Sequence, residues 1–522
     1  TRFREEGNID GFNFAFIDDH FDYHTSLDTY ERLDRNTLEH QGSYLMPLLN
    51  YFSNANLNNL KSDTDDIYFN VPLFKTVSYP FSWIMPMLII AVVFFLGLVF
   101  YGMNKRTLNG VEIGKGFLAF FASLLLNGII GFFSWKILVK IYPQYSEILH
   151  GFTYNGHSYI WAFSILSLAI CFWCYYKVYK PKNTASLLVA PLFVWILICG
   201  FVAYQLQGAS FFIIPVFFGL ISLFVLIRQK QPSLILMSLL AFPLLTIMSP
   251  FVKMFPVGLG LKLLIASTVL VTLMFGLLIG VFGFFKHKKR WAFLLLIIAL
   301  GIFISAHYNA SFSNETPKPN SLVYMLDVDK NEAVWASYDN QLDPWTEAYL
   351  SSNPDTNQAI SKTKFGSKYN TGFKYSKKAD KKSVNLPETN ILKDTIIGEN
   401  RHFRVLISPQ RPVNRMDLYA DSTNVFTSFK MNDLIIEKDS GDFVFSKRTS
   451  NRLFEYYVVD DAFLDIEFSV PKNQKTTLQY YGLSFNLLDN PLFNVPERPS
   501  NMIPKPFVVN DAVMLKKDIV LE

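Results

Sequence analysis

The sequence predicts a multi-span α-helical membrane protein, with a short α/β-type segment before the spans and an all-β, sandwich-like domain after them. Three observations predict this class. Half of the 522 residues are hydrophobic and only 17% are charged, against about 25% in an average soluble protein. The charge deficit is concentrated between Pro80 and His307. Beyond this stretch, short alternating apolar runs separated by turn residues return, which is the pattern of β-strands.

Eight apolar runs are candidates for membrane spans, since a spanning helix needs roughly 20 apolar residues to satisfy its backbone inside the bilayer. We expect spans at about 80–103, 116–138, 158–176, 185–204, 209–227, 232–250, 263–285 and 291–307.

Lys and Arg gather in alternate loops, and the positive-inside rule makes those loops cytoplasmic. The residues are Lys105, Arg106, Lys115, Lys177, Lys180, Lys182, Arg228, Lys230, Lys286, Lys288, Lys289 and Arg290. Lys140, Lys253 and Lys262 are the main exceptions. With eight spans, both termini then lie on the non-cytoplasmic side. The Lys and Arg residues that give the net charge of +5 are interpreted as determinants of membrane topology. No nucleic-acid partner is predicted.

Polar residues inside the spans are few. Only Lys136 is charged, and no span contains an acid, which argues against a proton-coupled transporter but not against a channel or a lipid-binding groove. The mildly polar residues are expected to join helices; they are Asn127, Ser134, Ser267, Thr268 and Thr272. The three cysteines lie within apolar runs and are expected to be buried; they are Cys171, Cys174 and Cys199.

The polar segment before the spans holds a His- and Asp-rich stretch, residues 18–29. Residues 12–17 alternate and then run apolar, which predicts a strand. Asp34 or Asn36 is a candidate cap for a helix with one buried face; that face would contain Leu38, Leu45, Leu48, Leu49 and Phe52. The stretch would therefore lie on a loop between strand and helix, where α/β domains place ligand sites.

The string Tyr23-His24-Thr25, followed by Asp28-Thr29 and Glu31-Arg32-Leu33-Asp34, resembles the C-terminal end of the two-zinc aminopeptidase family, which includes the glutamate carboxypeptidases. The resemblance implies that His24 binds one zinc through a ring nitrogen. It implies that the Tyr23 hydroxyl donates to the oxyanion formed when water attacks the peptide carbonyl. Asp28 would orient the loop or the zinc ligand without binding the metal itself.

Two further strings resemble the membrane-anchored subgroup of this family, the endoplasmic-reticulum and vacuolar membrane metallopeptidases and their bacterial relatives. They are residues 68–72, before the first span, and residues 320–346, after the last. That subgroup places a peptidase domain before a multi-span block and a further lumenal domain after it. The implied domains are the end of an α/β zinc peptidase-like domain at 1–75, the spans at 80–307 and a β-rich domain at 309–522.

A catalytic zinc centre needs more ligands than this chain offers in a matching motif. Three protein ligands are usual, and the two-zinc family also uses a bridging Asp and a Glu base. Six further histidines have no acidic partner at ligand spacing; they are His40, His150, His157, His287, His307 and His402. We therefore expect a peptidase portion upstream of Thr1, with an inactive remnant as the alternative. This chain alone is not expected to be active.

The segment after His307 predicts a β-sandwich. Expected strands are 321–328, 332–338, 402–408, 415–420, 425–430, 433–437, 454–459, 463–470 and 476–485. Residues 351–399 are polar and predict a flexible insertion.

The functional hypothesis is a membrane-bound zinc-dependent exopeptidase, a metallopeptidase with two zincs in its intact site, acting on peptides at the periplasmic or lumenal side. Its membrane would be a bacterial inner membrane, or that of the endoplasmic reticulum or vacuole in a eukaryote. Lipids surround the spans, and protein partners would bind the C-terminal domain. The alternative is a non-enzymatic scaffold, lipid-handling or channel-like protein with a partner-binding β-domain. A secondary transporter is the lesser hypothesis.

Overall fold

The computed structural model divides the chain into two compact units, which are described separately below. The helical unit contains Thr1–Tyr23 and Asp28–Ser311, and the β unit contains His24–Leu27 and Phe312–Glu522. The structure describes residues 2–15, 17, 18, 20–60, 62, 64–71, 75–229, 232–351, 365–368, 371–439, 441–459 and 462–521.

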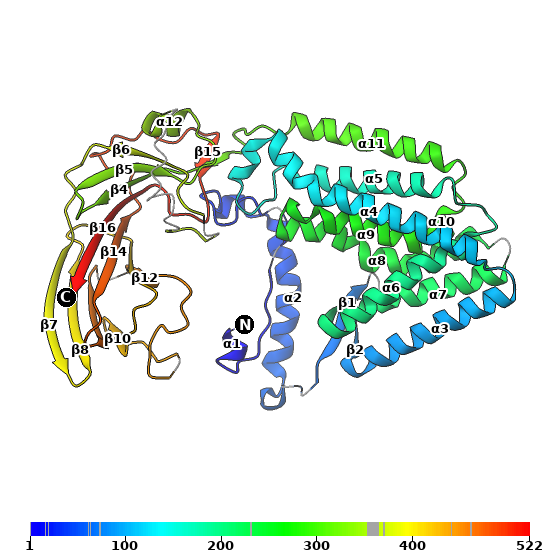
Figure 1. Ribbon diagram of the computed structural model, residues 1–522, viewed down its shortest axis with the longest axis horizontal. Helices are drawn as coiled ribbons and strands as arrows, with labels where there is room; N and C mark the ends of the chain where they lie inside the picture. Colours follow the sequence, from blue (N-terminus) through cyan, green and yellow to red (C-terminus); the bar gives the residue numbers. More distant parts are fainter. Residues whose placement is uncertain are drawn as a thin grey trace. The chain divides into compact units, whose positions relative to one another are not determined.

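Seven helices in the described part of the chain are long and apolar enough to cross a membrane. They are Phe81–Asn104, Gly110–Ile141, Gly156–Tyr175, Thr184–Gln205, Gln207–Arg228, Leu234–Leu259 and Lys288–Tyr308. In Figure 1 their α-helical parts are α3 (Ile84–Asn104), α4, α5, α6, α7 (Ile213–Arg228), α8 and α11. Each overlaps a predicted span. The prediction of a multi-span membrane protein is thereby confirmed.

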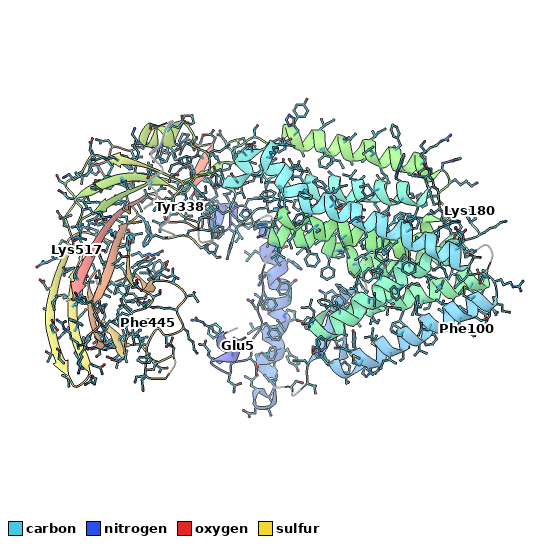
Figure 2. The ribbon with its side chains drawn as sticks, in the orientation of Figure 1. Glu5, Phe100, Lys180, Tyr338, Phe445 and Lys517 are labelled. Carbon is cyan, nitrogen blue, oxygen red and sulfur yellow. The ribbon has the colours of Figure 1, made fainter. Side chains whose placement is uncertain are left out.

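The remaining predicted span, 263–285, is a shorter apolar helix. It consists of α9 (Leu264–Leu277) and α10 (Ile279–Phe282), which meet at Leu278, where ψ is 7° and the α-helical pattern is interrupted. Backbone hydrogen bonds from Leu278 to Met274 and from Phe282 to Leu278 carry the chain through the interruption. Most residues of α9 are buried, because it packs against α4, α5, α6 and α8 at the centre of the unit (Figure 1). By contrast, Phe100 near the end of α3 (Figure 2) is 70% exposed.

Polar side chains join these helices, as expected from their mild polarity. The Asn127 amide donates to the Thr272 hydroxyl, and the Thr268 hydroxyl donates to the Asn127 carbonyl. Ser267 donates to the carbonyl of Val252 over 2.6 Å. That carbonyl lies four residues before Pro256, which has no N–H to offer it. Ser267 therefore satisfies a backbone group that the proline leaves open, as membrane helices require.

The segment before the spans differs from its prediction in two respects. Apart from Phe16, which lies outside the described residues, 12–17 forms no strand. The rings of Phe12 and Phe14 instead lie 5.6 Å from Phe52 and 5.0 Å from Tyr44, both on α2 (Arg35–Asn54). A lone extended segment has no strand to pair with, so its aromatic rings contact the helix. The α/β arrangement expected here is not present among the described residues.

The helix α2 forms where it was predicted, but without a buried face. The Asp34 carboxylate caps it by accepting from the backbone N–H groups of Asn36 and Thr37. None of the helix's residues is buried: Leu38 is 51% exposed and Leu49 61%. The prediction of one buried face is wrong in this structure, because no described element covers those leucines. Two further elements, α1 (Arg2–Glu5) and the hairpin of β1 (Asp66–Val71) and β2 (Lys75–Pro80), were not predicted.

The β unit contains two large sheets. The seven-stranded sheet has the order β12-β9-β14-β16-β4-β5-β6, with bounds β4 Val323–Asp327, β5 Glu332–Ser337, β6 Tyr375–Ala379, β9 Arg415–Ala420, β12 Arg452–Tyr457, β14 Thr476–Ser484 and β16 Ala512–Leu521. The five-stranded sheet has the order β11-β10-β13-β8-β7, with bounds β7 Glu388–Ile397, β8 Asn400–Ser408, β10 Ser428–Met431, β11 Leu434–Ile435 and β13 Leu464–Pro471.

These two sheets share one apolar core, as the β-sandwich prediction requires. Phe403 of β8 and Ile466 of β13 belong to the same cluster as Leu418 of β9 and Leu478 of β14. A short two-stranded parallel sheet, β3 (Lys318–Asn320) with β15 (Met502–Pro504), and the helix α12 (Pro344–Leu350) complete the unit. The C-terminal region is thus β-rich and separate from the helices.

The predicted flexible insertion at 351–399 is ordered in part. Strands β6 and β7 lie within it, whereas 352–364 and 369–370 lie outside the described residues. Strand β7 is an edge strand whose residues are nearly all exposed. It therefore lacks the apolar alternation by which a strand is predicted from sequence.

A buried ion pair joins two segments of the β unit. Lys505 lies with its ammonium 3.3 Å from the Asp339 carboxylate, and both side chains are 0% exposed. The same carboxylate oxygen accepts from the Ser321 hydroxyl over 2.8 Å, and the Lys505 ammonium donates to the carbonyl of the neighbouring Tyr338, which is labelled in Figure 2. Buried charges persist only when they are paired and hydrogen-bonded in this way.

Candidate functional site

The predicted site residues lie on a loop that ends at α2. Tyr23 is 56% exposed, and His24 and Asp28 are exposed too. His24 has a φ of +58°, in the left-handed region that residues with a Cβ seldom adopt. The loop therefore makes a sharp local turn at the position to which the resemblance assigns zinc binding.

An ion pair closes the loop on both sides of Tyr23 and His24. The Asp22 carboxylate accepts from Arg32 Nε over 2.7 Å and from Nη2 over 3.0 Å. Bidentate pairing of this kind fixes orientation as well as distance. The Thr25 hydroxyl accepts from the backbone N–H of Leu27 within the loop. Residues 23–31 are thus held as a closed loop by the chain's own side chains.

The three site residues lie within six positions of one another in the sequence. Tyr23 and His24 are neighbours in the chain, but Asp28 forms no hydrogen bond or ion pair with either among the described residues. Within the β unit, the His24 ring lies 5.3 Å from that of Phe507. The Lys368 ammonium lies 5.0 Å from the same Phe507 ring.

The residues that the structure describes do not fit a metal centre by themselves. No group of three or more His, Cys, Asp or Glu side chains among them has a geometry that holds a metal ion. His24 alone offers one ligand, whereas zinc takes three or four from a protein. A metal at His24 would need its other ligands from outside the described residues.

A polar cluster that the sequence did not predict lies just before the loop. Asp18 Oδ1 lies 2.8 Å from His157 Nε2 at the start of α5. Its Oδ2 lies 2.5 Å from Lys253 Nζ on α8. Lys253 is one of the exceptions to the charge pattern of the loops, and that exception was the only signal in the sequence that pointed to it.

Aromatic contacts accompany this cluster. The Phe21 ring lies 4.8 Å from Tyr154 and 5.9 Å from Phe152. The His20 ring lies 5.0 Å from His150. Burial, with a smaller contribution from the nearby His20, lowers the pKa of His150 to about 4. His150 is therefore neutral at pH 7, and its Nδ1 accepts from the backbone N–H of Phe152.

Comparison with known proteins gives three mammalian relatives. The chain is 29% identical over 142 residues to the rat protein named "Endoplasmic reticulum metallopeptidase 1", a stretch that covers 25% of this chain and 16% of the relative. The mouse and human proteins of the same name are 28% and 27% identical over the same shares. The chain thus spans about a sixth of the length of these relatives. No family model matches, and no solved structure matches.

These matches are weak and partial, and they support a relationship to metallopeptidase-like membrane proteins. They agree with the coarser resemblance to membrane-anchored metallopeptidases. The relatives' name identifies a metallopeptidase and does not specify the two-zinc aminopeptidase type.

Proposed function

We propose that this chain is part of a membrane-bound zinc-dependent peptidase, an exopeptidase whose catalytic site takes most of its residues from outside this chain. The observation that supports it most is the loop 23–31. The loop presents the exposed side chains of Tyr23 and His24, and the ion pair between Asp22 and Arg32 joins its two ends. The chain is also similar to proteins named as metallopeptidases. The chain's own part is to present these side chains to a peptide.

His24 is the proposed metal ligand and Tyr23 the proposed oxyanion donor. The phenolic hydroxyl of Tyr23 would donate to the carbonyl oxygen of the scissile bond as negative charge develops there, and such donors stabilise the transition state more than the substrate. Asp28 would orient the loop when the remaining residues of the site are present. Two zincs are expected in the intact site.

The test uses the natural full-length protein, purified in detergent and assayed with short peptides that carry a free terminus. His24→Ala should abolish cleavage that a chelator inhibits and added zinc restores. His40→Ala is the matched control, because His40 lies exposed on α2 with its ring against Tyr44. Undiminished cleavage by the His24 variant would rule out the assignment of His24.

The proposed orientation places the loop and the β unit on the non-cytoplasmic side, in the periplasm or the lumen. Its support is the Lys and Arg content of alternate loops, such as Lys180 and Lys182 between α5 and α6. Single cysteines placed at Lys180 and at Lys472, in a variant without the three native cysteines, test it. A membrane-impermeant thiol reagent applied from the non-cytoplasmic side should label only the second.

A second candidate function is a non-enzymatic scaffold that binds a partner through the β unit. A cavity of about 430 Å³ on the five-stranded sheet favours it, since this volume is in the range of ligand pockets. Its lining includes His402, Ser428, Lys430 and Glu467. On this hypothesis Lys430→Glu would remove a co-purifying partner, and the full-length protein would show no cleavage that depends on His24.

A further inference from the structure

Asp18 joins the segment before the candidate loop to two membrane helices. One carboxylate oxygen contacts His157 of α5 and the other contacts Lys253 of α8. The Asp18 side chain is 28% exposed, that of His157 39% and that of Lys253 52%. Ion pairs this accessible add little to stability, so the contacts are better suited to fixing a position than to holding the fold together.

The backbone at Asp18 adopts a conformation that needs support. Its φ is +124°, which a residue with a Cβ adopts only where its surroundings impose it. The two contacts of the carboxylate, with His157 and Lys253, are part of those surroundings. A turn of this kind redirects the chain just before residues 20–23.

Phe21 gives the segment a second, apolar attachment to the same part of the helical unit. Its ring packs on Phe152, which is 0% exposed, and on Tyr154. Both residues belong to the connection between α4 and α5. Asp18 and Phe21 thus attach the segment to one end of α5 by different kinds of contact, immediately before Asp22 closes the candidate loop with Arg32.

We propose that Asp18, His157 and Lys253 form a clamp by which the membrane helices α5 and α8 set the position of the Tyr23–His24 loop. The three are positioning residues: they act on the reaction through the loop and do not touch substrate. The inference rests on the proposed peptidase function, and it goes beyond it by giving the spans a part in catalysis. A displacement of about 1 Å at a catalytic group reduces rates on the order of a hundredfold.

Lys253 supports this role because its charge is otherwise unexplained. It lies in α8 between Pro250 and Pro256, on the side of the membrane where the charge pattern predicts few lysines. Lys262, nine residues further along the chain and just beyond the end of α8, lies on the same side and forms no ion pair among the described residues. The two lysines therefore make a matched pair for mutation.

The experiment compares Lys253→Met, Lys253→Arg and Lys262→Met in the full-length protein in detergent. We expect Lys253→Met to lower kcat about tenfold or more with a smaller change in KM. Lys253→Arg, which keeps the charge, should recover most of the rate, and Lys262→Met should match the wild type. Asp18→Asn should behave like Lys253→Met, because asparagine accepts a positive φ and removes only the charge.

Hydrogen exchange of residues 20–28 in the same variants is a readout that does not depend on activity. We expect faster exchange there in Lys253→Met and Asp18→Asn, and no change in α2. Unchanged exchange and unchanged kcat in both variants would overturn the clamp. If the wild type shows no cleavage that depends on His24, the proposed function fails, and the exchange data alone then decide whether the clamp exists.

Discussion

The side-chain amide of Asn127 in α4 donates a 2.7 Å hydrogen bond to the hydroxyl of Thr272 in α9, across 145 positions of sequence. Both residues are 0% exposed. Since α9 lies at the centre of the helical unit, this bond joins the central helix to one of its neighbours.

Thr272→Val should destabilise the helical unit by about 1 kcal/mol, because it removes the nearest acceptor of the buried Asn127 amide while keeping the side-chain volume. Thermal unfolding of the full chain in detergent measures the loss. Thr246→Val is the control, since the Thr246 hydroxyl bonds only to carbonyls of its own helix. Equal shifts in the two variants would mean that the contact between helices contributes nothing.

Lys505→Met should destabilise the β unit by roughly 3–5 kcal/mol, because the Asp339 carboxylate would keep its burial and lose its counter-charge. Hydrogen exchange of β5 in the full chain reports the effect. Lys472→Met removes the exposed pair with Glu399 and should leave β5 unchanged. Adding Asp339→Asn to Lys505→Met should restore part of the protection, and a lack of any restoration would contradict the pairing argument.

Tyr23→Phe should lower kcat for peptide cleavage about 10²–10³-fold and change KM little, if its hydroxyl meets the oxyanion only in the transition state. Steady-state kinetics of the full-length protein give both constants. Tyr30→Phe is the comparison, because Tyr30 lies in the same loop with its ring under Arg35. A loss confined to KM would assign Tyr23 to substrate binding instead.

The pH dependence of the helical unit should reflect His150. Its folded-state pKa of about 4 lies below its ordinary value of 6.5, so the unfolded chain binds more protons between these values. The stabilisation is complete above pH 6.5 and is lost as the pH falls toward 4, by at most about 1.4 kcal/mol per pH unit.

His150→Asn keeps an acceptor for the Phe152 N–H and removes the titration. The difference in melting temperature between this variant and the wild type should therefore change between pH 6.5 and 4 and stay constant above 7. His20 and His157, whose rings lie near His150 and Phe152, are present in both proteins. His40→Asn, on the exposed α2, is the control for replacing a histidine elsewhere in the chain.

The membrane spans could be predicted because the bilayer imposes a length and a composition on each helix by itself. The helix Leu264–Leu277 is the exception, because it is interrupted at Leu278 and is shorter than a full span. Its central position follows from burial among neighbouring helices, which the sequence does not show. Asp34 was also predictable, because a cap acts on the next three residues. The prediction of a strand at 12–17 was wrong, because alternation does not show what the side chains will contact. The rings of Phe12 and Phe14 contact the helix α2 instead.

Within the β unit, the edge strand β7 and the central strand β16 were not predicted, each for a different reason. In β7 nearly every side chain is exposed. In β16 the polar run Lys516, Lys517 and Asp518 breaks the apolar pattern, although Lys516 is paired with Asp327 of the neighbouring strand.

In the candidate site too, residues within a short string could be predicted, whereas contacts between distant positions could not. Tyr23, His24 and Asp28 came from a local string, and their roles remain proposals. The contact of Asp18 with His157 joins positions 139 residues apart, and no local pattern contains it. Lys253 was visible in the sequence only as an exception to the charge rule.

Strand β16 has a consequence for the order in which the β unit is completed during synthesis. It lies between β14, with which it is antiparallel, and β4, with which it is parallel (Figure 1). Strand β4 therefore leaves the ribosome long before its partner exists and presents an unpaired edge to the surroundings. Until residues 512–521 have been synthesised, the two halves of the seven-stranded sheet cannot join. A chaperone would bind the unpaired edge in that interval, and chain termination just before residue 512 would leave the sheet permanently divided.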